Sequence, residues 1–104
     1  MSQIHFHSDF YEAIKNGNKI QTARVDEPVP ELGKGEAIFD DKPSIEIQIT
    51  KVIHKSFDEL TIEEIKKDGF DSKEELWSVL LGFYPDLKQT DHLMLIEFSA
   101  IETD

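Results

Sequence analysis

The strongest constraint on the fold is a stretch in which apolar and polar residues alternate. Ile45, Ile47 and Ile49 are separated by single polar residues, and the strand is expected to continue to residue 53. Such alternation predicts a β-strand with one buried face. Residues 92–100 instead place apolar side chains on both faces, which predicts a strand in the interior of a sheet. The chain therefore has to build a sheet around these two strands.

The other predicted elements are short. Strands are predicted at residues 3–7, 19–25 and 37–39, and helices at residues 9–16, 62–68 and 73–81. Residues 27–35, which contain prolines and glycines, are predicted to form a loop. This order indicates the α+β class, with a small mixed β-barrel and peripheral helices, rather than a doubly wound parallel sheet. A length of 104 residues fits one domain over residues 1–104.

Several residues match known preferences for helix ends. Ser8 is expected to cap the first helix. The pairs Thr61 with Glu64 and Ser72 with Glu75 match the spacing of a capping box, in which each residue binds the backbone of the other. These signals fix where the helices of the second half begin.

The composition excludes several kinds of chemistry. The chain has no cysteine, which removes disulfides, thiolate nucleophiles and thiolate metal sites and suits a cytoplasmic protein. Its first residues show no basic region followed by an apolar run, so no signal peptide is expected. No apolar stretch approaches the roughly 20 residues that span a bilayer, so no membrane contact is expected.

The charge is unevenly distributed. The formal net charge is −11, yet residues 1–24 carry a net charge of +1 and residues 25–104 one of −12. Lysines and arginines bind nucleic-acid backbones by displacing counterions, so a chain this acidic disfavours long nucleic acid. The distribution is either chance in a short segment or one local electropositive site on an acidic body.

The segment from Gly17 to Arg24 holds the most suggestive group of polar side chains. Gly17 is expected to end the first helix, and Thr22 and Arg24 share one face of the strand that follows. Lys19, at the start of that strand, could reach the same side through its long stem or a bulge. A lysine and a threonine work as base and nucleophile when burial keeps the lysine neutral. The alternative, which spacing alone favours, is a solvated lysine and an ordinary strand threonine.

Other polar and aromatic residues have simpler explanations. The four histidines lack a metal-binding signature, so neither a metal nor another cofactor is expected. Asp68 closes a helix just before Gly69, as either a surface carboxylate or a carboxyl group over a pocket. Trp77 is expected in the core, whereas Tyr84 belongs either to the core or to a surface on which a base stacks.

Several of these residues recur together in one known family. They are Phe10, Ala13-Ile14-Lys15, Gly17, Lys19, Thr22, Arg24, Leu32-Gly33 and Gly35, followed by Asp68-Gly69-Phe70, Glu75-Leu76, Tyr84-Pro85 and Leu95-Ile96-Glu97-Phe98. In this order they resemble ASCH domains of the PUA-like superfamily over nearly the whole chain. The Gly-x-Lys-x-x-Thr-x-Arg element is the most specific part of the resemblance.

In length and layout the chain is also similar to the small bacterial N4-acetylcytidine amidohydrolases. That family uses a lysine, a threonine and a glutamate, and Lys19 and Thr22 match the first two. Ungapped alignment from Tyr84-Pro85 places Gly69 at the glutamate position, whereas one gap places Asp68 there, with a side chain one methylene shorter.

The resemblance implies amide hydrolysis. Neutral Lys19 would take the proton of Thr22, and Thr22 would attack the acyl carbonyl. Protonated Asp68 would then donate a proton to the leaving amine of cytosine. Arg24 would stabilise the oxyanion or hold the base or a phosphate, and would also lower the pKa of Lys19. Gly17 and Tyr84 are the further residues expected to bind substrate.

Three functions are compatible with this sequence. The first is an amidohydrolase for N4-acetylcytidine or a related small N-acylated nucleoside. The second is a non-catalytic RNA- or nucleotide-binding module, the role usually proposed for ASCH domains, and the third is a partner-binding domain with a vestigial pocket. The excess of 22 acidic over 11 basic residues favours a small nucleoside or a single nucleotide of RNA as ligand. An aspartate in place of the glutamate favours binding without catalysis.

Overall fold

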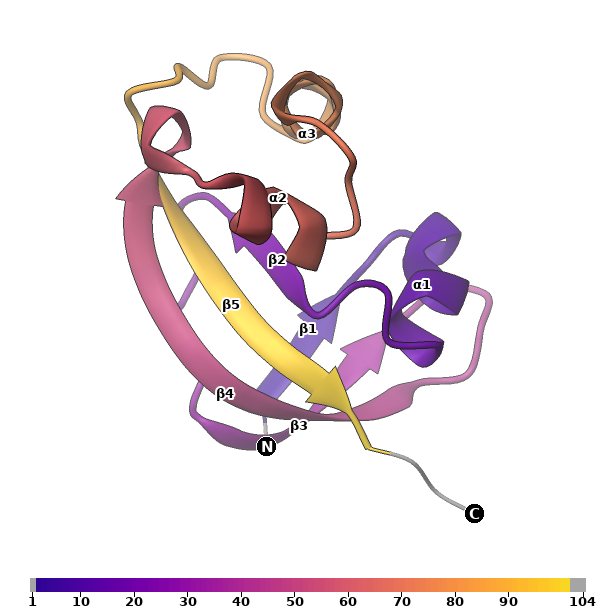
Figure 1. Cartoon of the computed structure of the whole chain (residues 1–104). Coiled ribbons are helices and arrows are strands. Elements are labelled where there is room, and N and C mark those ends of the chain that lie inside the picture. The colour runs from indigo at the N-terminus through magenta and orange to yellow at the C-terminus, as the bar shows by residue number, and fades with distance from the viewer. Residues whose placement is uncertain (1, 102–104) are drawn as a thin grey trace.

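The computed structural model describes residues 2–101 and is built around one five-stranded sheet (Figure 1). The strands are β1 (Ser2–His5), β2 (Gln21–Arg24), β3 (Gly33–Ile38), β4 (Ile45–Ser56) and β5 (His92–Ala100). The helices are α1 (Tyr11–Lys15), α2 (Ile62–Lys67) and α3 (Lys73–Phe83), with 3₁₀ turns at Ser8–Phe10 and Phe57–Glu59. The strand order is β1-β3-β4-β5-β2; β1 and β3 run parallel, and the other neighbouring strands run antiparallel.

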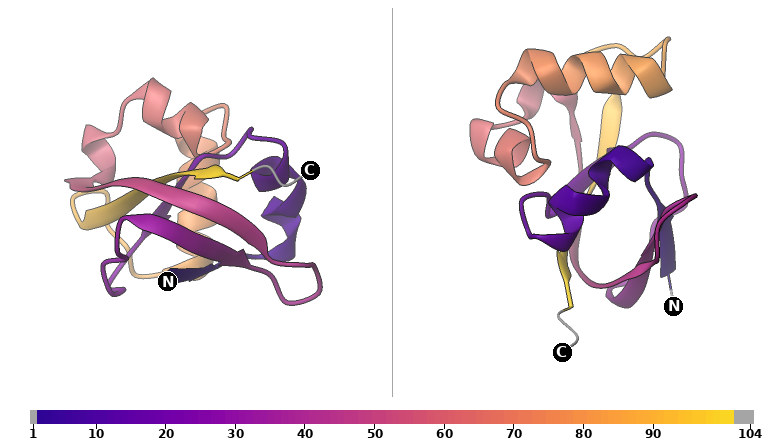
Figure 2. Two further views of the ribbon diagram at one scale, coloured as in Figure 1. Left: turned by 90° about the horizontal axis from the view of Figure 1, so that it is seen from below. Right: turned by 90° about the vertical axis from the view of Figure 1, so that its right-hand side faces the viewer.

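The sheet curls into a half-barrel (Figures 1 and 2). Strand β4 is 12 residues long, three residues beyond its expected end, and its pairing with β5 shifts register between Ile49 and Lys51. Such an irregularity bends a strand and increases its twist. The two edge strands are linked by Arg24 of β2, whose Nη2 donates to the carbonyl oxygen of His5 in β1 at 2.6 Å. The predicted α+β class with a small barrel-like sheet is confirmed.

The two faces of the sheet carry separate apolar cores. One core holds residues of β1, α1, β3 and β4 together with one face of β5: Ile4, Phe6, Ile14, Ala37, Phe39, Ile47, Ile49, Met94, Ile96 and Phe98. The other lies under α2 and α3: Ala23, Phe57, Leu60, Ile65, Phe70, Leu76, Leu80, Leu87, Leu93 and Leu95. Each such side chain stabilises the fold by about 1.5–3 kcal/mol when fully buried. Strand β5 contributes to both cores and lies between β4 and β2, so its predicted interior position is confirmed.

Strand β3 begins earlier than the sequence suggests. The loop predicted for residues 27–35 ends before Gly33, because Gly35 pairs with Ser2 of β1 and with Ile47 of β4. A Cβ atom on Gly35 would lie 2.9 Å from the backbone oxygen of Ser2 and 3.1 Å from the Ile49 side chain. Gly35 thus admits the neighbouring strand at close distance instead of forming part of the loop.

Replacing Gly35 with alanine is therefore expected to lower the free energy of unfolding by about 1–3 kcal/mol, because the added methyl group overpacks the sheet. Gly82→Ala is the matched control. No atom lies within 4 Å of a Cβ at that helical position, and alanine stabilises helices relative to glycine by up to about 1 kcal/mol. Urea denaturation of both variants measures the difference. Equal stabilities would show that Gly35 is not sterically required.

The helix ends agree with the sequence in part. Thr61 and Glu64 form the predicted capping box, and Ser72 accepts the Glu75 amide at 3.2 Å. Ser8 does not cap the first helical segment; the Asp9 amide instead donates to His7 Nδ1 at 3.1 Å, because Ser8 turns its hydroxyl to Asp41. Within residues 2–101, no helix is long and apolar enough to cross a membrane.

Candidate functional site

A cavity of about 110 Å³ opens at the outer edge of β2, where the two cores meet. Five of the six site residues predicted from the sequence contribute to its wall: Lys19, Thr22, Arg24, Asp68 and Tyr84. The other predicted residue, Gly17, lies outside the wall and forms the turn after α1, with a φ of 85°. The sequence segments from α1 to β2 and from α2 to α3 thus converge on one small space.

Lys19 and Asp68 form a buried pair inside this cavity. Each side chain is only 3% exposed, the two are joined by an ion pair, and Lys19 Nζ also donates to the Asp68 backbone oxygen at 2.8 Å. The Lys19 nitrogen lies 4.7 Å from the centre of the Phe10 ring and 5.3 Å from that of Phe70. The prediction that spacing alone favoured, a solvated lysine, is wrong, because Asp68 and the two aromatic rings cover the Lys19 side chain.

Burial lowers the proton affinity of Lys19 and raises that of Asp68, so it favours the uncharged form of both partners. Loss of hydration lowers the pKa of Lys19 against the attraction of Asp68, and repulsion from Arg24 lowers it further. Loss of hydration also raises the pKa of Asp68, against the attraction of Lys19. Both shifts favour a neutral amine beside a protonated carboxyl group. Among the hydrogen bonds of residues 2–101, none satisfies the buried Asp68 Oδ2.

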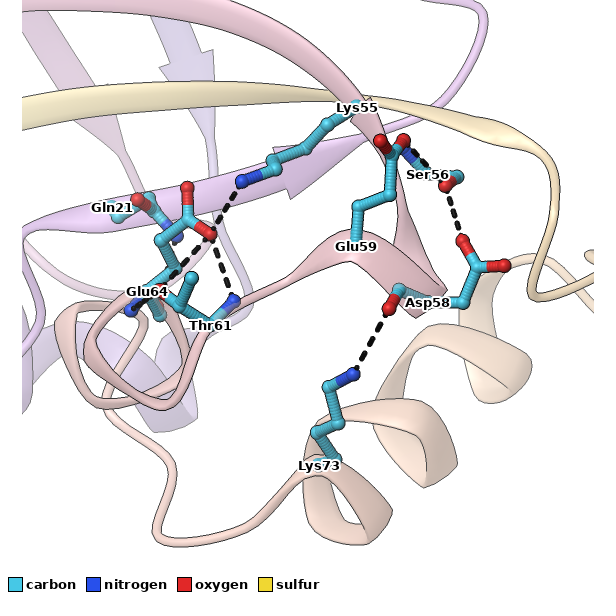
Figure 3. Close-up of polar contacts among 8 residues, drawn as sticks. All are labelled: Gln21, Lys55, Ser56, Asp58, Glu59, Thr61, Glu64 and Lys73. Atoms are coloured by element: carbon cyan, nitrogen blue, oxygen red, sulfur yellow. Dashed lines mark hydrogen bonds and ion pairs between the residues drawn. The ribbon is translucent and has the colours of Figure 1, made fainter.

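The position of Asp68 follows from the way α2 is attached to the sheet. The Ile20 amide of the turn before β2 donates to the Lys67 carbonyl at 2.8 Å, and Gln21 Nε2 donates to the Glu64 carbonyl at 3.0 Å. On the opposite side, Lys55 of β4 binds the Glu64 carboxylate at 2.9 Å (Figure 3). These contacts hold the C-terminal end of α2, and with it Asp68, against Lys19.

A second polar cluster lies nearby, and its contacts hold the backbone after β4 in place. Ser56 binds the carboxylates of Asp58 and Glu59, and Lys73 of α3 donates to the Asp58 carbonyl at 3.3 Å (Figure 3). This cluster closes the 3₁₀ turn after β4 and connects it to α3.

Thr22 and Arg24 share one face of β2, as predicted, and their side chains are bonded to each other. Arg24 Nε donates to Thr22 Oγ1 at 3.1 Å, and Arg24 Nη1 lies 3.6 Å from Glu27 Oε1. Thr22 is buried at 5% exposure. The hydrogen bonds found within residues 2–101 include none between Lys19 and Thr22. The predicted pair thus faces one cavity without a hydrogen bond between its two side chains.

The backbone of β2 adds a donor at this edge. The Phe98 amide donates to the Ile20 carbonyl at 2.9 Å, and antiparallel ladders alternate bonded and non-bonded residue pairs. The alternation directs the amide of Ala23 away from β5, and Ala23 lines the cavity. A main-chain N–H next to Thr22 is suited to stabilise an oxyanion.

Tyr84 and Trp77, the two aromatic residues considered for base stacking, make other contacts in the structure. Tyr84 donates to Glu27 Oε2 at 2.9 Å, and burial together with this bond raises the pKa of Tyr84. Trp77 packs in the second core against Phe57, with ring centroids 4.7 Å apart, as predicted. Glu27 was not identified from the sequence, because only the folded loop brings it to Arg24 and Tyr84.

Two of the four histidines lie at this cavity. His5 and His7 line the cavity, yet no group of His, Cys, Asp or Glu side chains in residues 2–101 could hold a metal ion. The polar side chains of the cavity wall are thus an amine, a carboxyl group, a hydroxyl, a guanidinium, a phenol and two imidazoles.

Comparisons with known proteins agree with this architecture. The family model described as the ASCH domain matches residues 2–102. No curated protein matches the sequence. The structure resembles the ASCH domain from Lactobacillus crispatus, with a TM-score of 0.77 and 18% identity over 95% of this chain and 78% of the other.

Two further solved structures show the same fold. Protein EF3133 from Enterococcus faecalis has a TM-score of 0.73 and 15% identity over 97% of this chain and 80% of its own. A mutant of ZmASCH from Zymomonas mobilis has a TM-score of 0.69 and 15% identity over 96% of this chain and 71% of its own. At these identities the likeness concerns the fold.

Proposed function

Because the chain belongs to the ASCH domain family, we propose that it is an amidohydrolase that acts on N4-acetylcytidine or a related small N-acylated nucleoside. The observation that supports this most is the buried Lys19–Asp68 pair, which shares a cavity with the Thr22 hydroxyl. A neutral amine is a base and a protonated carboxyl group is an acid, and amide hydrolysis needs one of each.

The first half of the reaction transfers the acyl group to the enzyme. Thr22 Oγ1 attacks the amide carbonyl while its proton moves to Lys19 Nζ. The Arg24 Nε that donates to Thr22 stabilises the developing alkoxide, and the Ala23 amide stabilises the oxyanion. Asp68 then protonates the departing amine as the C–N bond breaks. The products are an ester on Thr22, a free amine, a Lys19 ammonium and an Asp68 carboxylate.

Water completes the cycle. The Asp68 carboxylate takes a proton from water as the water oxygen attacks the ester, and the Lys19 ammonium returns its proton to Thr22 Oγ1 as the ester bond breaks. Both residues end in their starting states, with one amide and one water converted to an amine and an acid. Lys19 and Thr22 are not hydrogen-bonded to each other, so the proton transfer requires the two side chains to approach when substrate binds.

The size and charge of the site support a small, neutral acyl compound. A cavity of about 110 Å³ is comparable to an engineered apolar cavity of about 150 Å³ that binds benzene, so it admits an acylated amide and the edge of a base. The Lys19–Asp68 pair carries no net charge wherever its proton lies, and Arg24 is paired with Glu27. This pairing leaves little positive potential for a long phosphate backbone.

One assay tests the proposal directly. The purified protein is incubated with N4-acetylcytidine, and cytidine and acetate are measured by chromatography. We expect the two products in equal amounts, at a rate proportional to protein concentration. An absence of turnover would refute the proposal.

The second candidate is a nucleotide-binding module without catalysis. It is favoured by the aspartate at position 68 and by the lack of a bond between Lys19 and Thr22. It predicts binding of short RNA that weakens with salt. Salt-dependent RNA binding without any deacetylation would favour this candidate over the hydrolase.

A further inference from the structure

A second cavity, of about 260 Å³, adjoins the first at the open seam between the edge strands β1 and β2. The two cavities share His5 and Arg24 in their walls. The second is lined further by β1, by the loop after β2 and by β5, including Ile4, Glu27, Val29 and Met94. It is thus the larger space, and it lies directly across Arg24 from the proposed chemistry.

Arg24 contacts three groups at the junction of the two cavities. Its Nε binds Thr22, its Nη2 binds the His5 carbonyl, and its Nη1 lies 3.6 Å from Glu27. The Arg24 side chain is only 15% exposed, whereas the Glu27 side chain is 40% exposed. Glu27 is therefore the more exposed of the two charged side chains at this junction.

We infer that the second cavity receives the ribose of a neutral nucleoside whose acylated amide occupies the first cavity, and that Glu27 accepts a ribose hydroxyl and repels a 5′-phosphate. This inference rests on the proposed function. Carboxylates recognise ribose hydroxyls in dinucleotide-binding proteins. The apolar side chains of Ile4, Val29 and Met94 suit the carbon face of a sugar.

The volumes of the two cavities support placing the acylated amide in the first and the ribose in the second. The first cavity, at about 110 Å³, is too small for a whole nucleoside, and the second provides the missing volume on the side of Arg24. A bare base should therefore bind more weakly than its nucleoside, because it leaves the second cavity empty.

The test compares binding of cytidine, cytosine and cytidine 5′-monophosphate by titration calorimetry at low salt. Glu27→Gln removes the charge but keeps an oxygen that accepts from Tyr84. Glu31→Gln is the matched control, because Glu31 is exposed in the same loop and lines neither cavity. Both variants change the net charge equally.

We expect the wild type to bind cytidine about tenfold more tightly than its 5′-monophosphate, as repulsion between nearby charges requires. Glu27→Gln should remove most of this preference and weaken cytidine binding, whereas Glu31→Gln should preserve both. Equal binding of nucleoside and nucleotide, equal binding of nucleoside and base, an unchanged ratio in Glu27→Gln, or no binding of any of the three would overturn the inference.

The same ligands separate this inference from the proposed function. Preferred binding of cytidine without turnover of N4-acetylcytidine would refute the hydrolase and keep the ribose site. Equal turnover of N4-acetylcytidine, its 5′-monophosphate and N4-acetylcytosine would refute the ribose site and keep the hydrolase.

Discussion

Thr22→Val is expected to reduce deacetylation of N4-acetylcytidine by at least roughly a thousandfold, because valine has the shape of threonine without the attacking oxygen. Thr22→Ser, which keeps the oxygen, should retain activity within about tenfold of the wild type. Initial rates of cytidine release measure both variants. Substantial activity in Thr22→Val would exclude Thr22 as the nucleophile.

A stability measurement has to accompany this result. Thr22→Val removes the acceptor of Arg24 Nε, which costs about 1–3 kcal/mol when the donor is left buried and unpaired. Thr50→Val is the matched control: Thr50 lies on β4 and donates to the Glu97 carbonyl at 3.2 Å, away from the cavity. Full activity in Thr50→Val, together with a folded but inactive Thr22→Val, would show that the loss is chemical.

Lys19→Met is expected to make stability depend strongly on pH. In the wild type, the lowered pKa of Lys19 makes the free energy of unfolding rise with pH, whereas the raised pKa of Asp68 makes it fall, so the two effects oppose each other. Without Lys19, folded Asp68 keeps its proton above pH 3.8 whereas the unfolded chain loses it. The folded state then binds more protons, and the free energy of unfolding falls as pH rises.

The expected slope is up to about 1.4 kcal/mol per pH unit relative to the wild type, from pH 3.8 to the raised pKa of folded Asp68. Urea denaturation across this range measures it. The double variant Lys19→Met/Asp68→Asn should lose the slope, and Lys67→Met, which removes a more exposed lysine paired with Glu97, should not acquire it. A Lys19→Met variant with the pH dependence of the wild type would mean that Asp68 is not held protonated.

The parts of the fold that were predictable are those set by local pattern. The alternation of Ile45, Ile47 and Ile49 located β4, and the apolar faces of residues 92–100 located β5 in the interior. The capping box at Thr61 set the start of α2. In each case the signal lies within a few neighbouring residues and needs no knowledge of distant ones.

The parts that escaped prediction depend on contacts between distant segments. The burial of Asp68 follows from the bond between the Ile20 amide and the Lys67 carbonyl, 47 positions apart in the numbering. The early start of β3 follows from the approach of Ser2 to Gly35. In the site, the sequence motif identified Lys19, Thr22 and Arg24 as candidates. Only the folded structure shows that Lys19 is paired with Asp68 and Arg24 with Glu27.

The central claim is that an acyl group passes through Thr22, and partition of that acyl group between water and hydroxylamine tests it most directly. N4-acetylcytidine and N4-acetylcytosine would give the same acetyl ester on Thr22, so the ratio of acetohydroxamate to acetate at fixed hydroxylamine is predicted to be equal for both. A ratio that changes with the leaving amine, release of cytidine without hydroxamate, or no turnover at all would contradict the proposed mechanism.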